Sequence, residues 1–322
     1  MNVELLIANK RTGKIWDIAN STKEITWTTS RTGTPGVLKF SVQKAGDLSF
    51  TEGDVVRFSQ DGELQFYGWV FTKEKDRWDN IDVTCYDRLR YLKANASYAF
   101  YAQSAADIIK QIAEDMQVST DALSDPGYKI PSLIEEDQCC LDIIGKAVQY
   151  TLLNTGKVYV FYDSGNGLSL TAADDMKTSI VIGDKSYLGE YTYKTDIDSE
   201  TYNSVKLARP NESTGRADVY VVQDSDNIKQ WGLLQLYQKI DGDMNEAQIM
   251  EQANVSLTYY NRRMRTLSCS SIGLRGLRAG QMIAMKIDGL GDIDLDQYML
   301  LEKVTHTYEN DLHTMDFELK AI

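Results

Sequence analysis

The sequence predicts a mainly β protein with an α/β insert, in which two related β-barrel-like domains flank a small α/β module. Short β-branched and aromatic runs separated by turn residues fill residues 1–95. Helical periodicity appears within 96–189, and strand patterns return over 190–322, interrupted by one inserted helix at about 244–264. At 322 residues the chain is long enough for each of these three domains to bury a core of its own.

Residues 1–95 are predicted to form strands throughout. The apolar runs are VELLIAN, KIWDI, EITWTT, VLKFSV, DVVRFS, FYGWVFT and IDVTCYD. Turn signals lie between them, in the segments RTGK, RTGTPG, TEGD, QDGE and KDRWDN. Short strands at regular spacing with turns of this kind are typical of a sandwich or a barrel.

The first helix of the α/β module is predicted to begin at Ser104. Asp107 stands three residues later, which is the spacing of a capping box, with Asp in place of the usual Glu. One helical face then carries the apolar residues Ile108, Ile109, Ile112 and Met116.

A second helix is predicted after the acidic residues Glu135, Glu136 and Asp137. Its inward face carries Leu141, Ile144, Val148 and Leu152. The segment Asn154-Thr155-Gly156 is a helix stop signal. The hairpin KVYVFYD-SGNG-LSLTA, with Gly165-Asn166-Gly167 at its turn, completes the module.

The last domain is predicted to combine strands with one helix. The strand runs before the helix are GEYTYKT, NSVKLAR, ADVYVVQ and LLQLYQKI. Asn245 is the expected N-cap of the helix, with Gln248 reaching back to it. The arginines of RRMR at its end complement the negative pole of the helix dipole. The runs RTLSCSSIG and AGQMIAMKI and a closing hairpin follow.

Two segments far apart in the chain have the same pattern. At an offset of 234, Val70 falls on Val304, and the alternating residues Ile81, Val83 and Cys85 fall on Met315, Phe317 and Leu319. At an offset of 227, the turn and strand EGDVV, 52–56, fall on AGQMI, 279–283. The longer loop DGLGDIDLDQY can absorb the difference between the two offsets. The recurrence in the same order predicts a structural duplication.

The charge of the chain argues against sequence-specific nucleic-acid binding. The formal net charge is -13, and the Lys and Arg residues are scattered, so most of the surface should repel phosphate. A conduit that nucleic acid passes without sticking is compatible with this charge. We expect no membrane insertion, because no run approaches the roughly 20 apolar residues of a spanning helix. The start of the chain resembles no signal peptide, so folding in the cytosol is expected.

The candidate chemical sites have structural explanations that are at least as good. His306 and His313 lie on the two arms of the closing hairpin and could approach each other, but no third metal ligand is evident. Asp241, Asp243 and Asn245 resemble the start of a calcium loop, but Glu246 stands where that loop needs Gly. We interpret this segment as a helix N-cap.

A further acidic segment is GDIDLDQ, where Asp292, Asp294 and Asp296 alternate. They could share one face and hold a hard cation, but a solvated loop is the simpler reading. Cys85, Cys139, Cys140 and Cys269 fit buried reduced thiols rather than a disulfide framework. We found no hydrolase, P-loop or HExxH motif, and therefore predict no catalytic, cofactor-binding or metal-binding residue, no cofactor and no enzymatic activity.

A family resemblance rests mainly on the last hundred residues. The segments DSDNIKQWGLLQLYQKIDGDMNEAQIMEQANVSLTYYNRRMRTLS, LRAGQMIAMKI and DLDQYMLLEKVTHTYENDLHTMDFEL, with GYKIPSLIEEDQCCLDIIGKAVQYTLLNTGKVYVFYD before them, resemble XkdQ/YqbQ-like proteins of defective-prophage particles. That group is similar to the baseplate hub proteins of contractile phage tails, the late control protein D group.

The resemblance implies a structural baseplate hub protein of a contractile phage tail or phage-tail-like bacteriocin. Such proteins use two related β-barrel-like domains per chain, and three chains close into a ring with a pseudo-sixfold face. The implied partners are two further copies of the chain, the tail tube protein, the spike protein, and the tape-measure and baseplate wedge proteins. The implied location is the baseplate of a virion or tail-like particle assembled in the bacterial cytoplasm. A tail-associated cell-wall hydrolase and a glycan-binding adhesin remain alternatives.

Overall fold

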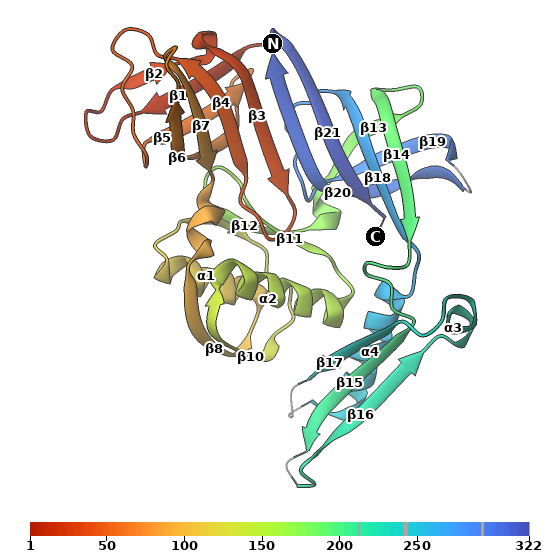
Figure 1. Ribbon diagram of the computed structural model, residues 1–322. Coiled ribbons are helices and arrows are strands. Elements are labelled where there is room, and N and C mark those ends of the chain that lie inside the picture. Colours follow the sequence, from red (N-terminus) through yellow and green to blue (C-terminus); the bar gives the residue numbers. More distant parts are fainter. Residues whose placement is uncertain (212, 241–243, 291–292, 322) are drawn as a thin grey trace.

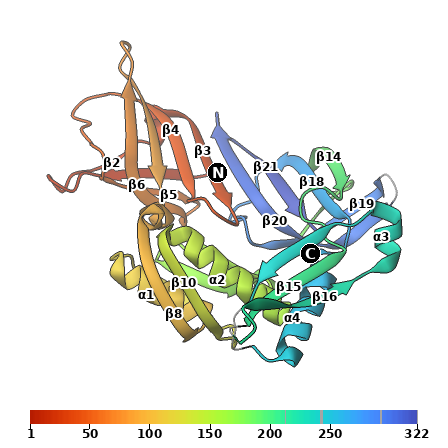
Figure 2. The ribbon, with the colours of Figure 1, turned by 60° about the horizontal axis from the view of Figure 1, so that its bottom comes forward.

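The computed structural model describes residues 1–211, 213–240, 244–290 and 293–321, with the side chains of 293 and 294 excepted. Two groups of strands lie side by side at the top of Figure 1, and the α/β module lies below the first of them. A smaller sheet with its helices extends below the second group, as Figure 2 also shows. One sheet of thirteen strands runs through both upper groups, which confirms the prediction of a mainly β fold.

The first β unit, as we call β1 to β7, encloses its own core. Its strands are β1 (Val3–Ala8), β2 (Ile15–Asp17), β3 (Thr22–Ser30), β4 (Val37–Gln43), β5 (Val55–Gln60), β6 (Glu63–Lys75) and β7 (Asn80–Tyr86), with a short 3-10 helix at Ala19–Ser21. Alternate residues point inward, as period-two patterning requires; on β4 these are Leu38, Phe40 and Val42.

The α/β module follows directly. It comprises the 3-10 helix η2 (Arg88–Lys93), β8 (Asn95–Gln103), α1 (Ala105–Asp115), β9 (Thr120–Leu123), β10 (Ile130–Cys139), α2 (Cys140–Thr155), β11 (Tyr159–Asp163), β12 (Leu168–Ala172) and a 3-10 turn at Ala173–Met176. The capping box of Ser104 and Asp107 is confirmed. The stop at Gly156 is also confirmed, with a left-handed φ of 68°.

The predicted acidic start of the second helix is wrong. Glu135, Glu136 and Asp137 lie on β10, which pairs with β8, and α2 begins only at Cys140. The cause is long-range strand pairing, which overrides the local preference for acidic residues in a first helical turn.

The second β unit consists of β13 (Lys177–Gly183), β14 (Leu188–Asp196), β18 (Met264–Ile272), β19 (Met282–Leu290), β20 (Ile293–Glu309) and β21 (Leu312–Lys320). The predicted α/β module, 96–189, includes 177–183, but β13 pairs in parallel with β19 of the large sheet. Ile182 lies in the core of this unit together with Leu267, Met285 and Phe317. Burial against a distant strand therefore determines the position of β13.

The insertion in the second β unit is larger than the single helix predicted at 244–264. It contains β15 (Ser204–Asn211), β16 (Arg216–Gln223), α3 (Ser225–Trp231), β17 (Gln235–Lys239) and α4 (Glu246–Tyr260). The three strands form a sheet of their own, and Ile249 and Ala253 of α4 pack with Val205 and Leu207 of β15. The predicted N-cap at Asn245, with Gln248 completing the box, is confirmed. No helix among the described residues is long and apolar enough to cross a bilayer.

Candidate functional site: the joint between the two β units

The two β units repeat the same succession of paired strands. In the first, β5, β6, β7, β4 and β3 are neighbours in that order; in the second, β19, β20, β21, β18 and β14 are. Irregularities in the strand register recur at equivalent positions of the two units. The register shifts between Val70 and Thr72 of β6, and between Leu301 and Lys303 of β20. It also shifts after Thr22 in the β3–β4 pair and after Leu188 in the β14–β18 pair.

The turn before β5 recurs before β19 in atomic detail. Gly53 and Gly280 have φ of 85° and 93°. The Gly53 amide donates to the Val70 carbonyl at 2.8 Å, and the Gly280 amide donates to the Leu301 carbonyl at 2.7 Å. The offset of 227 is thereby confirmed for this strand. Val70 corresponds to Leu301, however, so its predicted match with Val304 is wrong. The second copy is longer than the first, and part of its extra length lies before this position while the rest lies after it.

The two units join through β3 and β20. These strands pair antiparallel, with Thr28 opposite Thr305, and the two hydroxyls lie 3.0 Å apart. Next to this pair, Arg31 Nε donates to Glu302 Oε2 at 2.9 Å in a mostly buried ion pair. The joint is therefore a continuation of the sheet, held by backbone pairing as well as by side chains.

Buried aromatic side chains cover the core side of this joint. Trp27 of β3 stacks on His306 of β20 with ring centroids 5.1 Å apart. Tyr308 of β20 meets Phe58 of the first β unit edge to face at 4.9 Å. Trp27 and Tyr308 are both 4% exposed, so the cores of the two units are in contact here.

The two histidines lie in a buried hydrogen-bonded chain at the joint. His306 Nε2 lies 2.7 Å from the Leu277 carbonyl, and His306 Nδ1 lies 2.9 Å from His313 Nε2. A carbonyl can only accept, so His306 carries its proton on Nε2, and Nδ1 accepts from His313. His313 Nδ1 then faces the Gln60 amide at 3.4 Å, and the Tyr308 hydroxyl donates to Gln60 Oε1 at 3.1 Å.

The buried position of this hydrogen-bonded chain keeps both histidine rings neutral. Burial lowers the pKa of His306 to about 4, and burial together with the neighbouring His306 lowers the pKa of His313 to about 4. The sequence-based expectation that the two rings could approach each other is confirmed. Within the described residues, no group of three or more His, Cys, Asp or Glu side chains is arranged to hold a metal ion.

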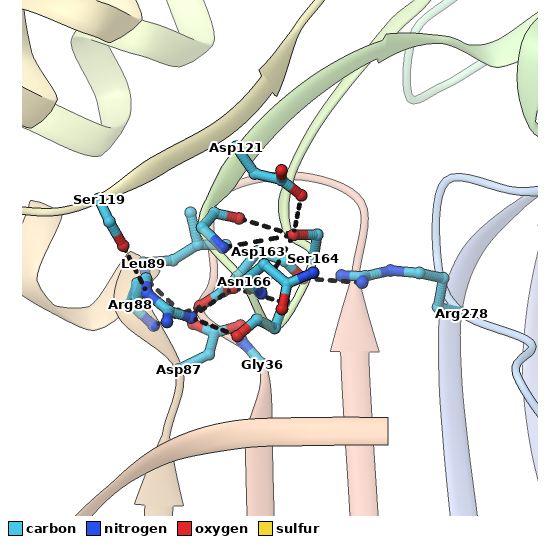
Figure 3. A network of polar contacts seen from close by, with 12 residues as sticks. Gly36, Asp87, Arg88, Leu89, Ser119, Asp121, Asp163, Ser164, Asn166 and Arg278 are labelled. Carbon is cyan, nitrogen blue, oxygen red and sulfur yellow. Dashed lines mark hydrogen bonds and ion pairs between the residues drawn. The ribbon is translucent and has the colours of Figure 1, made fainter. Parts of the chain in front are cut away.

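A second polar cluster connects the α/β module to both β units (Figure 3). Arg88 Nη1 lies 2.9 Å from Asp163 Oδ1, and its backbone amide donates to Asp163 Oδ2 at 2.9 Å. Arg278 of the second unit donates from Nη1 to the Asp163 carbonyl at 2.7 Å. Asp87, which follows β7 directly, accepts from the amides of Gly36, between β3 and β4 of the first unit, and Leu89 at 2.8 and 3.0 Å.

Electrostatics in this cluster reflect its burial. Desolvation, and then the charge of Asp163, raise the pKa of Asp87 above its usual range. Desolvation lowers the pKa of Arg278. The sequence does not predict this cluster, because its members lie far apart in the chain. The available local signal was Asp87, whose side chain caps η2.

Each β unit also carries a polar groove on the equivalent side of its sheet. The groove of the first unit is lined by Glu24, Thr26, Lys39, Phe40, Ser41, Thr72, Lys73, Glu74, Asp82, Val83 and Thr84. The groove of the second is lined by Glu190, Tyr191, Thr192, Ser268, Cys269, Ser270, Lys303, Thr305, Asp316, Phe317 and Glu318. The strand registers make nearly all of these positions equivalent, so the repeat extends to the surface.

The remaining sequence candidates do not converge on a site. Asp241, Asp243 and Asp292, and the side chain of Asp294, lie outside the described residues. Asp296 forms an exposed ion pair with Lys286 at 3.2 Å. The cysteines are free thiols: Cys85, Cys140 and Cys269 are buried, and Cys139 is half-buried. Burial raises the pKa of Cys269 to about 12, so this thiol is unreactive.

Comparison with known proteins finds a matching family and two related proteins. The chain matches the YqbQ-like family over residues 25–320. It is 31% identical over 275 residues to the uncharacterized protein YqbQ of Bacillus subtilis strain 168, covering 84% of this chain and 82% of YqbQ. It is 28% identical over 284 residues to XkdQ of the phage-like element PBSX from the same strain, covering 86% and 85%.

Solved structures share the fold at low sequence identity. A 43 kDa tail protein of prophage MuSo2 from Shewanella oneidensis superimposes with a TM-score of 0.71 at 12% identity, covering 98% of both chains. The E. coli c3393 protein, a type VI secretion component described as similar to the T4 tail proteins gp27 and gp5, gives 0.55 at 12% identity over 93% of this chain and 73% of that one. The matched length and the identity to YqbQ show that the chain belongs to the YqbQ-like family.

Proposed function

We propose that the protein is a structural component of a phage-type tail baseplate, a hub of which three copies form a ring between the tail tube and the central spike. The observation that carries this proposal is the β3–β20 joint, which places two equivalent β units side by side in one sheet. Three chains with two units each would present six similar units around one axis. A sixfold tube could stack on one face of such a ring and a threefold spike could dock on the other.

The relatives support a role in tails. XkdQ belongs to a phage-like element, and the MuSo2 protein is a tail protein. The c3393 protein links the fold to type VI secretion and to T4 tail proteins. From this likeness we infer contacts with the tube protein, the spike protein, and the tape-measure and wedge proteins, in a particle assembled in the bacterial cytoplasm.

The polar grooves fit a channel that a polyanion passes without binding. Acidic side chains, Glu24, Glu74 and Asp82 in one groove and Glu190, Asp316 and Glu318 in the other, exceed the basic ones. Such a surface repels phosphate rather than holding it. If the joined sheet lines the ring, its polar side would face the lumen.

We infer a structural rather than a catalytic role. The MuSo2 protein is a tail protein and XkdQ belongs to a phage-like element, while the two histidines are held neutral in a buried hydrogen-bonded chain away from solvent. Purified protein on a cell-wall zymogram should give no clearing. Clearing that one carboxylate substitution abolishes would instead identify a tail-associated hydrolase.

Copy number tests the proposed hub directly. Quantitative mass spectrometry of intact particles should count three chains per particle, and antibody labelling should locate them at the end of the tube. Six copies, or label along the sheath, would contradict the proposal.

A further inference from the structure

The β3–β20 joint pairs one strand from each β unit. The strands equivalent to these two, β14 and β6, each have an edge without a strand partner among the described residues. On one edge, β20 pairs with β19 along its first half, 293–300, and with β3 along its second half, 303–309. The equivalent strand β6 pairs with β5 along 63–69. Among the described residues, no strand occupies the same edge of β6 over 72–75.

The equivalent of β3 is also free on one side. β14 pairs with β18 and ends the sheet, so its other edge has no strand partner within the described chain. The exposure of its side chains agrees with this free edge. Tyr191 is 42% exposed, whereas its counterpart Ile25 at the joint is 4% exposed. A long free edge of this kind is a template for pairing with another chain.

We propose that β14 of one chain pairs antiparallel with the second half of β6 in a second copy of the chain, repeating the β3–β20 joint between molecules. The repeat fixes the register. Thr28 corresponds to Lys194 and Thr305 to Glu74, so Lys194 should lie opposite Glu74. By the same correspondence, Asp196 should lie opposite Thr72, and Tyr193 opposite Lys75.

The charges agree with this register. Lys194 and Glu74 are both exposed and of opposite sign, and such a pair directly across two antiparallel strands is stabilising. Lys194 already contacts Asp196 on its own strand at 3.0 Å, so the contact would add Glu74 to an existing ion pair. Tyr193 would face the aliphatic chain and ammonium of Lys75, where Trp27 faces His306 at the internal joint.

A second copy is the partner that the geometry favours. The two free edges lie at opposite ends of the molecule in both ribbon views, so the contact is head to tail (Figures 1 and 2). A head-to-tail contact forms a ring when its rotation closes. The eight strands from β14 to β6 would then continue from copy to copy, and closure would leave neither edge free.

The proposed contact is shorter than the internal one. β6 ends at Lys75, and its hairpin with β7 closes soon after, whereas β20 continues to Glu309. We therefore expect association of isolated chains to be weak and to strengthen when a tube or spike holds the copies in place. This inference rests on the proposed hub function and adds the surface by which the copies meet.

Cross-linking in assembled particles tests the register. The variant with both Glu74→Cys and Lys194→Cys should form a disulfide between chains, because opposed Cβ atoms in antiparallel strands lie within reach of one. Mild oxidation should convert most of the chain into a covalent trimer on a non-reducing gel. Each single variant should remain monomeric on the gel, and the register-shifted pair Glu74→Cys with Asp196→Cys should give severalfold less trimer.

The outcomes separate this proposal from the hub function. Three copies per particle with no cross-link in the Glu74–Lys194 pair would overturn the β14–β6 contact and leave the hub standing. A copy number other than three would overturn the hub itself. Charge reversal adds a check: Glu74→Lys and Lys194→Glu should each lower particle yield severalfold, and the double reversal should restore it. Lys229→Glu, on the exposed face of α3, should leave the yield unchanged. If the double reversal fails to restore it while the single variants fold normally, the pairing is wrong.

Discussion

Gly53 and Gly280 occupy the same turn in the two β units, but Val160 lies against only one of them. A Cβ added at Gly280 would meet Val160 Cγ1 at 2.3 Å, whereas one added at Gly53 would meet nothing within 4 Å. Both residues have a positive φ that other L-residues rarely adopt. The pair therefore separates backbone strain from crowding within one molecule.

Replacing each glycine by alanine should destabilise the protein to different extents. Gly53→Ala should cost about 1–3 kcal/mol of unfolding free energy through strain alone. Gly280→Ala should cost roughly a further 1–3 kcal/mol, because the methyl group also collides with Val160. Urea denaturation measures both. In the Gly280→Ala background, Val160→Ala should recover part of the loss, and equal losses for the two glycine variants would contradict this account.

The joint between the units should depend on Trp27. Trp27→Ala removes a buried indole that stacks on His306, and the expected loss is about 3–5 kcal/mol. Hydrogen exchange should show faster exchange of β20 amides over 303–309, because β3 is their partner there. The matched control is Trp78→Ala, since Trp78 is 65% exposed. Equal effects of the two substitutions would show that the joint is not held by this contact.

The buried histidines should make stability fall on mild acidification. Their pKa of about 4 in the folded protein lies below the unfolded value of about 6.5, so the unfolded state binds more protons between these values. The histidine contribution to stability is therefore complete above about pH 6.5 and is lost as the pH falls toward 4. His313→Gln should reduce the difference in urea midpoint between pH 7 and pH 5. An unchanged difference in that variant would contradict the buried neutral chain.

The cluster around Asp163 should be far more sensitive than a surface ion pair. Asp163→Ala leaves the largely buried Arg88 without its partner, and the expected loss is about 3–5 kcal/mol. Asp47→Ala breaks the exposed pair with Lys14 and should cause no measurable change. Thermal unfolding of both variants measures the contrast. Because Arg278 also binds this residue, through its carbonyl, Arg278→Met should loosen the same region.

Features set by neighbouring residues could be predicted from the sequence. The capping box at Ser104, the stop at Gly156 and the cap at Asn245 all depend on residues within a few positions. The turn shared by Gly53 and Gly280 could be found because β5 and β19 begin at the same distance after these two glycines.

Features set by long-range pairing could not be predicted in the same way. Nothing near 177–183 indicates that β13 pairs with β19 across the chain. The acidic residues before Cys140 favoured an earlier start of α2, which pairing of β10 with β8 prevents. The cluster of Asp87, Asp163 and Arg278 exists only once three separate segments have folded together. Helix α3 had a local signal in Asp224, which caps it, but the run is short.

A reconstruction of the intact particle at side-chain resolution tests the central claim most directly. We expect three copies between tube and spike, with the β units of all three alternating around one axis and β14 of each copy beside β6 of the next. A ring in which the two β units of a chain lie at different radii or heights, with no strand pairing between copies, would contradict the account.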